Sequence, residues 1–218
     1  MRNSVVFFLS SLLLISCNSK QVENQSEVVA EIQETNENFK EKNFHELFKR
    51  ISPEEISDNV FTLVGKDFMV ITAGKEKHYN SMTAGWGGFG IYFNKAASWC
   101  MLRANRYTLE LIQKEQTYTL SFFSEEYKEQ VMFLGSKSGR DSEKMKEVQL
   151  TSVPTPSGDM TFKEARLIIG CKLTELTTVK PDDFYMEENK DFIDEAFKEA
   201  NDYHKLVFGE ITHVWIRK

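Results

Sequence analysis

Residues 80–90 read NSMTAGWGGFG, and four of these eleven residues are glycine. The stretch lies among strand-forming residues, where a glycine has no side chain to pack and costs backbone entropy. One interpretation is that a planar ligand lies against this strand, because the missing side chains let backbone amides approach it. The alternative is a bulged barrel strand that its glycines bend at a corner. Taken alone, the segment leaves both interpretations open.

The chain around this stretch reads as a series of short strands with a few helices between them. β-Branched, aromatic and alternating residues predict strands at 60–64, 68–72, 81–93, 97–102, 117–123, 165–173 and 206–216. Apolar periodicity and capping residues predict helices at 43–50, 107–114, 124–135, 141–147 and, in part, 182–201. This order favours a mainly β protein, an antiparallel barrel rather than alternating β–α–β units.

Two further segments combine basic and hydroxyl side chains. RANRYTLELI spans residues 103–112, and GSKSGRD spans residues 135–141. Each precedes or begins a predicted helix, and a helix N-terminus together with arginine holds phosphate well. The simpler alternatives are a pair of solvated arginines and an ordinary polar loop, and each segment alone leaves its alternative open.

Together, the three segments resemble the flavin reductase-like family of FMN-binding split barrels, and in particular its flavoredoxin-like branch. The resemblance runs from FHELFKRISPEEISDNVFTLVGKDFMVITAG through YTLSFFSEEYKE and FKEARLIIGCKL to DYHKLVFGEITHVW, which is residues 44–218. It implies a mainly β, Greek-key split β-barrel with added helices. It also implies a homodimer with FMN near the dimer interface.

The resemblance also implies which residues hold FMN. Residues 80–86 are expected to line the isoalloxazine ring, residues 121–123 to border it, and the two basic segments to hold the phosphate and ribityl chain. The expected cofactor-binding residues are Asn80, Ser81, Met82, Thr83, Ala84, Trp86, Arg103, Asn105, Arg106, Tyr107, Thr108, Ser121, Phe122, Phe123, Lys137, Ser138, Gly139, Arg140 and His204. For His204 a purely structural role stays open.

No catalytic side chain and no metal ligand is expected. FMN carries redox chemistry itself, while the protein positions and tunes it. No cysteine or histidine pair in the chain has the spacing of zinc ligands. Cys100 and Cys171 lie in apolar, strand-like runs, which favours buried free thiols, although a disulfide between them is left open.

The first 17 residues have the layout of a secretory signal peptide. Arg2 precedes an apolar run, residues 5–15, which is too short to span a bilayer. The run ends in Leu-Ile-Ser-Cys, which resembles a bacterial lipobox and predicts lipidation of Cys17. An ordinary signal peptide with a chance cysteine, or a cytoplasmic protein with a misread N-terminus, are the alternatives.

The remainder of the chain is expected to be a polar tether, residues 18–43, and one domain, residues 44–218. The chain has 27 basic and 33 acidic residues and a net charge of −6, which argues against a nucleic-acid partner. A lipid anchor predicts a place in the bacterial cell envelope outside the cytoplasm, in the periplasm or at the outer membrane.

The sequence therefore predicts an FMN-dependent oxidoreductase that carries out flavin-dependent electron transfer or reduction. NAD(P)H is a candidate electron donor. Because NAD(P)H is a cytoplasmic pool, a periplasmic or membrane redox partner is favoured over it. The alternative function is a lipid-anchored ligand-binding or structural barrel that has lost its flavin.

Overall fold

The structure is a computed structural model, and it describes residues 42–197 and 202–218. Contacts divide the chain into two units, Met1–Asn43 and Phe44–Lys218. The predicted signal peptide, its Cys17 and nearly all of the predicted tether lie outside the described residues. Within the described part, no helix is both long and apolar enough to cross a membrane.

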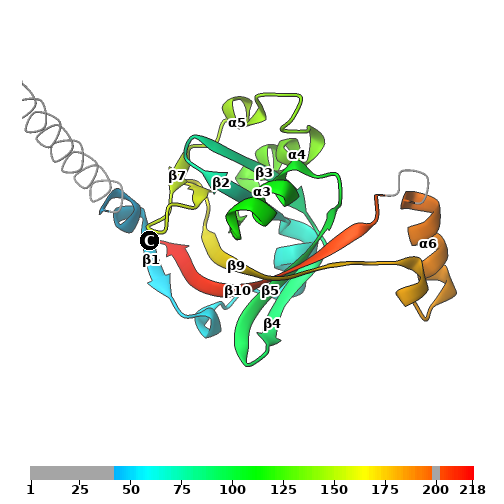
Figure 1. Cartoon of the computed structure of the whole chain (residues 1–218). Helices are drawn as coiled ribbons and strands as arrows, with labels where there is room; N and C mark the ends of the chain where they lie inside the picture. Colours follow the sequence, from blue (N-terminus) through cyan, green and yellow to red (C-terminus); the bar gives the residue numbers. More distant parts are fainter. Residues whose placement is uncertain (1–41, 198–201) are drawn as a thin grey trace, which may run out of the picture. The chain divides into compact units, whose positions relative to one another are not determined.

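Antiparallel strands build most of the second unit (Figure 1). They are β1 (Phe48–Ile51), β2 (Met69–Lys75), β3 (His78–Ala84), β4 (Gly87–Tyr92), β5 (Lys95–Arg103), β6 (Thr117–Phe122), β7 (Ser152–Pro154), β8 (Met160–Phe162), β9 (Leu167–Thr178) and β10 (His204–Arg217). The main sheet has the order β3-β2-β6-β9-β10-β5-β4, and β1 also pairs with β10. β7 and β8 form a separate hairpin. The predicted mainly β architecture is confirmed.

The last strand, β10, organises this sheet. It pairs with β9 along most of its length, with β5 at its beginning and with β1 at its end. The ladder with β5 places His204 directly opposite Arg103. The path of paired strands ends at β3 and β4, which do not pair with each other in the described sheet. The sheet therefore curls into a barrel that stays open between these strands.

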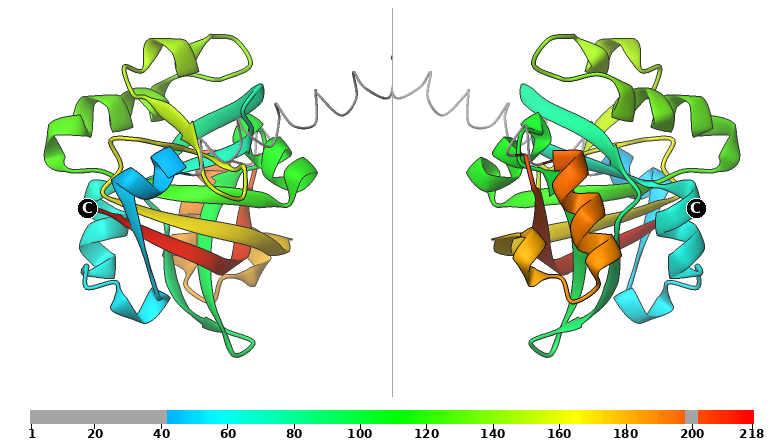
Figure 2. Two further views of the ribbon diagram at one scale, coloured as in Figure 1. Left: turned by 90° about the vertical axis from the view of Figure 1, so that its left-hand side faces the viewer. Right: turned by 90° about the vertical axis from the view of Figure 1, so that its right-hand side faces the viewer.

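Helices cover one side and one end of this barrel. They are α2 (Val60–Thr62), α3 (Tyr107–Glu115), α4 (Lys128–Ser136), α5 (Lys144–Glu147) and α6 (Glu187–Phe197), with short 3₁₀ turns at Pro53–Glu55, Glu125–Tyr127 and Pro181–Asp183. α3 and α4 pack on β2 and β3, whereas α6 stands at the far ends of β9 and β10 (Figure 1). Figure 2, right, views this end, with α6 in front of the strands.

The prediction of a strand at 60–64 is wrong, because the chain there is helical. α2 is followed by a π-helical turn, η2 (Leu63–Asp67). The side chain of Asn59 accepts hydrogen bonds from the backbone N–H groups of Phe61, at 3.0 Å, and Thr62, at 3.2 Å. This is the N-cap arrangement that starts a helix. The predicted helix at 43–50 also ends early, because Phe48 begins β1.

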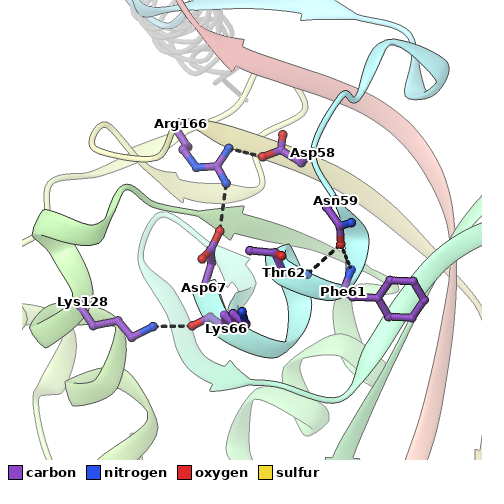
Figure 3. A network of polar contacts seen from close by, with 8 residues as sticks. All are labelled: Asp58, Asn59, Phe61, Thr62, Lys66, Asp67, Lys128 and Arg166. Carbon is purple, nitrogen blue, oxygen red and sulfur yellow. Dashed lines mark hydrogen bonds and ion pairs between the residues drawn. The ribbon is translucent and has the colours of Figure 1, made fainter.

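Ion pairs and hydrogen bonds hold the two ends of this helical segment to the barrel (Figure 3). The guanidinium of Arg166, just before β9, donates to Asp58 at 2.7 Å and to Asp67 at 3.1 Å. Lys128 of α4 donates to the backbone carbonyl of Lys66. The guanidinium of Arg166 thus binds both ends of residues 58–67. This long-range contact favours helical turns over a strand in that segment.

Two glycines of residues 85–90, Gly88 and Gly90, lie next to an aromatic side chain of the protein itself. The indole of Trp99, on the paired strand β5, lies across both of them. A Cβ on Gly88 would stand 2.6 Å from Trp99 Cζ2. At Gly85 a Cβ would stand 2.8 Å from the ring of Phe68. At Gly85 and Gly88, aromatic side chains of the protein itself therefore occupy the space that a Cβ would need.

Cys100 and Cys171 are both free and fully buried in the barrel core. Burial raises the pKa of both thiols, that of Cys171 to about 12. A thiol that stays protonated at neutral pH is a poor nucleophile. The two cysteines therefore belong to the core packing and not to a reactive site.

Two alanine substitutions on β4 test the role of Trp99. Gly88→Ala is expected to lower the free energy of unfolding by about 1–3 kcal/mol, because the new methyl overlaps the indole. Gly90→Ala is the matched control, since its Cβ would meet the same indole at an ordinary contact distance of 3.5 Å. Urea unfolding of both variants measures the difference, and equal stabilities would contradict this account of the glycines.

Candidate functional site

The turn between β5 and α3 places the first predicted basic segment. Arg106 is the N-cap of α3 and has extended backbone angles, φ −73° and ψ 126°. The buried carboxylate of Asp202 holds the turn, because it pairs with Arg103 Nε at 2.6 Å and accepts from the backbone N–H of Asn105 at 2.8 Å. The turn thus presents the guanidinium of Arg106 and the first N–H groups of α3 to one region.

A cavity of about 60 Å³ lies at this N-terminus. The turn and start of α3, strand β3, the end of α4, the loop after it and the first residue of α5 enclose the cavity. Its lining residues are Asn80, Met82, Thr83, Asn105, Arg106, Tyr107, Thr108, Leu134, Gly135, Lys137, Ser138, Gly139 and Lys144. The three segments selected from the sequence therefore meet at one small cavity, which we call the phosphate cavity.

Hydrogen bonds tie the walls of this cavity together. Asn80 of β3 donates its side-chain amide to Thr108 Oγ1 at 2.8 Å, and both side chains are buried. Gly139 packs against the same amide, and a Cβ there would stand 2.0 Å from Asn80 Oδ1. Only glycine permits this close approach, so the loop after α4 is fixed against β3.

Positive charge at this cavity is only partly neutralised. Lys137 pairs with Glu147 at 2.7 Å, and Arg140 pairs with Glu110 and stacks over the ring of Tyr107. Arg106 has no acidic partner among residues 42–197 and 202–218. Glu147 and Glu110 thus neutralise Lys137 and Arg140. The guanidinium of Arg106 stays available to an anion.

Lys144 is a second cation without an acidic partner in the described part of the chain. Its side chain is buried, and Nζ donates to the carbonyls of Leu134 and Lys137, both at 3.0 Å. Burial, and then the charge of Arg106, lower the pKa of Lys144 to about 8. Sequence reasoning missed this residue. KMKE contains two similar lysines, and only the packing of α5 decides which one is buried.

A second cavity, of about 170 Å³, adjoins the first and shares Met82, Thr83 and Arg106 with it. It lies at the open side of the barrel, between β3, β5 and the start of β10. Its lining residues are Met82, Thr83, Ala84, Gly85, Trp86, Met101, Arg103, Arg106 and His204. Trp86 is 45% exposed and forms part of the rim. We call this second cavity the ring cavity. It is wider and less charged than the phosphate cavity.

His204 forms the back of the ring cavity. Its ring lies 5.0 Å from that of Trp86 and 4.7 Å from that of Phe197, between centroids. Burial, and then the nearby Arg103, lower the pKa of His204, so the imidazole is neutral at pH 7. Its buried Nδ1 has no hydrogen-bond partner in the described residues. A buried polar atom of this kind is rare and indicates a missing partner.

The two cavities bring together most of the residues expected from the sequence. Fourteen of the nineteen line one or both of them. The residues that line neither are Ser81, Ser121, Phe122, Phe123 and Arg140. Sequence reasoning also did not single out Met101 and Leu134, which are ordinary apolar residues of a strand and a helix.

Four of these five residues lie in the buried sheet and core, and the fifth, Arg140, pairs with Glu110. Ser81 bonds to Thr72 at 2.7 Å, and Ser121 bonds to Thr161 at 2.9 Å, both in the buried sheet. Phe122 and Phe123 are buried in two separate parts of the hydrophobic core. Strand β6 lies between β2 and β9, so neither edge of it reaches the opening of the barrel. Residues 121–123 therefore line neither of the two cavities.

Comparisons with known proteins identify solved structures with a similar fold. Among solved structures, an FMN-binding protein from Thermus thermophilus with bound p-hydroxybenzaldehyde is 21% identical, with a TM-score of 0.53 over 68% of this chain and 70% of that chain. An FMN-binding domain of a flavin reductase-like enzyme from Shewanella baltica is 14% identical, with a TM-score of 0.55 over 78% and 76%. Flavoredoxin from Desulfovibrio vulgaris is 19% identical, with a TM-score of 0.53 over 76% of each chain.

These structures share the fold of this chain, and the predicted split barrel is confirmed. No protein with a curated description matches the sequence. The family model of the flavin reductase like domain matches residues 62–218, which is most of the chain and includes both cavities. The chain therefore belongs to the flavin reductase-like family.

Proposed function

We propose that the protein binds FMN, with the phosphate in the phosphate cavity and the isoalloxazine ring at the ring cavity. The observation that carries this proposal is the pairing of the two cavities. One is small and cationic, the other is wider and partly aromatic, and they adjoin through Met82, Thr83 and Arg106. A ligand with a charged end and a flat end fits this arrangement.

At the phosphate end, the protein offers donors of three kinds. Arg106 supplies a guanidinium that has no acidic partner in the described part of the chain, and a guanidinium binds phosphate oxygens in a forked geometry. The start of α3 supplies backbone N–H groups and the positive end of its helix dipole. The loop of Lys137, Ser138 and Gly139 supplies further donors. These groups would hold a phosphate without any metal ion.

At the ring end, the walls provide flat contact and two polar groups. Met82, Met101 and Trp86 offer apolar and aromatic contact area. FMN supplies the reversible electron transfer when it is bound, while the protein positions the ring and tunes its potential. The cation of Arg106, close to the ring cavity, favours added negative charge there. Nδ1 of His204 is available for a hydrogen bond to the edge of the ring or to a reaction partner.

The proposed role is electron transfer between this flavin and a periplasmic or membrane partner. The support for this choice is the lipobox-like end of residues 14–17, which favours an anchored protein outside the cytoplasm. NAD(P)H is a cytoplasmic pool, so its oxidation is the less favoured role. The proposed location of the protein is the cell envelope. The flavoredoxin-like branch of the family fits this electron-transfer role.

A homodimer is proposed from a third cavity and the apolar surface beside it. This cavity, of about 470 Å³, is lined by Val60, Phe61, Val64, Gly65, Gly85, Gly87, Gly88, Phe89 and Trp99. Phe61 is 88% exposed, and Ile91 and Phe93 on the β4–β5 hairpin are 75% and 82% exposed. Exposed apolar side chains on neighbouring elements, here α2 and the hairpin that begins with β4, are typical of an interface. The cavity shares Gly85 with the ring cavity, so a second copy would lie beside the flavin.

Flavin titration of the full-length protein tests the proposed cofactor. FMN is expected to bind with a shifted absorbance spectrum, and Arg106→Ala is expected to weaken binding by about tenfold or more. Arg140→Ala is the comparison variant, and its effect is expected to be smaller because Glu110 already pairs with Arg140. NADPH added to the loaded protein is expected to leave the flavin oxidised, while dithionite bleaches it.

The contrary outcomes are distinct. If FMN does not bind at all, the flavin proposal fails and the alternative of a barrel without flavin stands. If FMN binds equally well to the Arg106→Ala variant, the phosphate does not lie in this cavity. Rapid bleaching by NADPH would contradict the proposed electron source.

Light scattering of two variants tests the homodimer. Phe61→Asp is expected to give a monomer, because a charge in an apolar interface is costly to bury. Met132→Asp is the matched control, since Met132 is a 51% exposed apolar residue on α4, outside the lining of the third cavity. A dimer that survives Phe61→Asp, or a wild-type protein that is monomeric, would exclude this interface.

Labelling with radioactive palmitate tests the lipid anchor. The wild-type protein is expected to incorporate label and to sediment with membranes, since Cys17 would carry the acyl chains. Cys17→Ala is expected to abolish both, and Cys100→Ala is the matched control, because Cys100 is buried in the barrel. Label that persists in the Cys17→Ala protein would refute the anchor.

A further inference from the structure

The helix α6 and the turn before it carry most of the negative charge of the protein. Residues 180–197 contain seven acidic and two basic residues, a net charge of −5, whereas the whole chain has a net charge of −6. Six of these acidic side chains are exposed and form no ion pair with any residue of 42–197 and 202–218. They are Asp182, Asp183, Glu187, Glu188, Asp191 and Glu195.

The charges on α6 work against the stability of the helix itself. Glu187, Asp191 and Glu195 follow one another at intervals of four residues, which brings like charges together on the helix surface. Like charges at this spacing destabilise a helix. Ile193 and Phe197 are buried on the other side of α6 and hold it to the barrel despite this repulsion. We take the retained repulsion to indicate that the charge serves a partner outside the chain.

Large apolar side chains are exposed among these carboxylates. Phe192 is 54% exposed, and Tyr185 and Met186, just before α6, are exposed as well. Glu188 lies four residues before Phe192 and Glu195 three residues after it, so the three share one face of the helix. We call these five residues the α6 face. Apolar groups within charges of one sign are typical of a surface that binds a partner of the opposite charge.

The α6 face lies beside the ring cavity. The ring of Phe192 stands 6.5 Å from that of Trp86, between centroids, and Trp86 forms part of the rim of the cavity. Figure 2, right, shows α6 in front of the strands at this end of the barrel. A protein bound to the α6 face would therefore lie next to the opening of the ring cavity.

The buried side of α6 contacts the wall of the same cavity. Phe197 packs on the ring of His204, and the guanidinium of Arg103 stands 5.3 Å from the centre of the Phe197 ring. Both His204 and Arg103 line the ring cavity. His204 is 8% exposed, and its Nδ1 points to a missing ligand there, because it has no hydrogen-bond partner in the part of the chain described. A ligand in the cavity and a partner on the α6 face would thus be separated by one helix.

We propose that the α6 face binds a small electron-transfer protein whose redox group lies within a basic surface. This inference rests on the proposed flavin site and names the chemistry of its redox partner. Charge complementarity supports this occupant, because a negative patch attracts a positive one and speeds their association. The same charge repels anionic lipid and a second copy of this acidic chain. Electron-transfer complexes are small and weak, so one helix face with a few apolar side chains is large enough.

Binding of mitochondrial cytochrome c, a small basic haem protein, tests the α6 face without any flavin. The flavin-free, full-length protein is expected to bind it at low salt and to lose most of this affinity at about 0.2 M salt, where surface charges are screened. Glu188→Gln with Glu195→Gln is expected to weaken binding by about tenfold, because two charges at the contact are removed. Isothermal titration calorimetry measures these affinities.

A second pair of exposed glutamates is the matched control. Glu125→Gln with Glu126→Gln removes the same charge from the turn Glu125–Tyr127, and neither residue lines the phosphate or ring cavity. This pair is expected to leave binding nearly unchanged. Phe192→Ser is expected to weaken binding at low and moderate salt alike, since it removes apolar contact and no charge. Met132→Ser, a similarly exposed apolar residue on α4, is its control.

The rate of electron transfer from the FMN-loaded, dithionite-reduced protein provides another readout. Each reduced flavin gives one electron to each of two cytochrome molecules, so two iron(III) ions become iron(II) and the flavin protons pass to water. This rate is expected to fall about tenfold at low salt in Glu188→Gln with Glu195→Gln. A small uncharged quinone, which takes both electrons and two protons, is expected to react equally with all variants. Cytochrome c with acetylated lysines, which lack the charge, is expected to react slowly with all of them.

The contrary results separate the partner site from the flavin site. No binding of cytochrome c by the wild-type protein, or equal weakening by the two glutamine pairs, would overturn the proposal, because no particular face would then be used. If FMN does not bind while the two pairs still differ, the proposed function fails and the α6 face stands as a docking surface. If FMN binds and the two pairs have equal affinities and rates, the flavin site stands and the α6 face is excluded.

Discussion

The pairing of β10 with both β5 and β9 is the constraint on which the rest of the structure depends. β10 is the strand that connects the two halves of the sheet, and it also pairs with β1 at its end. Its register against β5 sets His204 opposite Arg103. A shift of one residue would turn every side chain of a strand to the other face. The buried Asp202 sits just before β10 and holds the turn into α3, so this register also positions Arg106.

The site exists because the barrel does not close. β3 and β4 are the two ends of the paired path, and the ring cavity opens where β3 faces β5. A closed barrel would satisfy every strand edge but would leave no place for a ligand between strands. The helices α3, α4 and α5 cover the neighbouring edge and build the phosphate cavity. The two cavities are therefore products of one opening and of the helices that border it.

Patterns in the sequence predicted the helices and strands whose formation depends on interactions between neighbouring residues. The periodicity of residues 107–114 predicts α3, and the alternation of residues 165–173 predicts much of β9. The segment 60–64 was misjudged because its β-branched and aromatic residues favour a strand, whereas Asn59 and the distant Arg166 favour a helix. The site was predictable in outline from three segments. Lys144 was missed, and the burial of residues 121–123 was not foreseen, because burial in this fold depends on contacts far along the chain.

The electrostatics of the site follow from how the acidic residues are distributed. The chain as a whole is acidic, with a net charge of −6, yet two cations that lack an acidic partner among the described residues meet at one cavity. Asp202 pairs with Arg103, Glu110 with Arg140, and Glu147 with Lys137, so acidic partners neutralise these three cations at and beside the cavities. Arg106 and Lys144 remain outside these pairs. Because a buried charge interacts strongly at low dielectric, the surplus of positive charge acts on whatever occupies the cavity rather than on the surface.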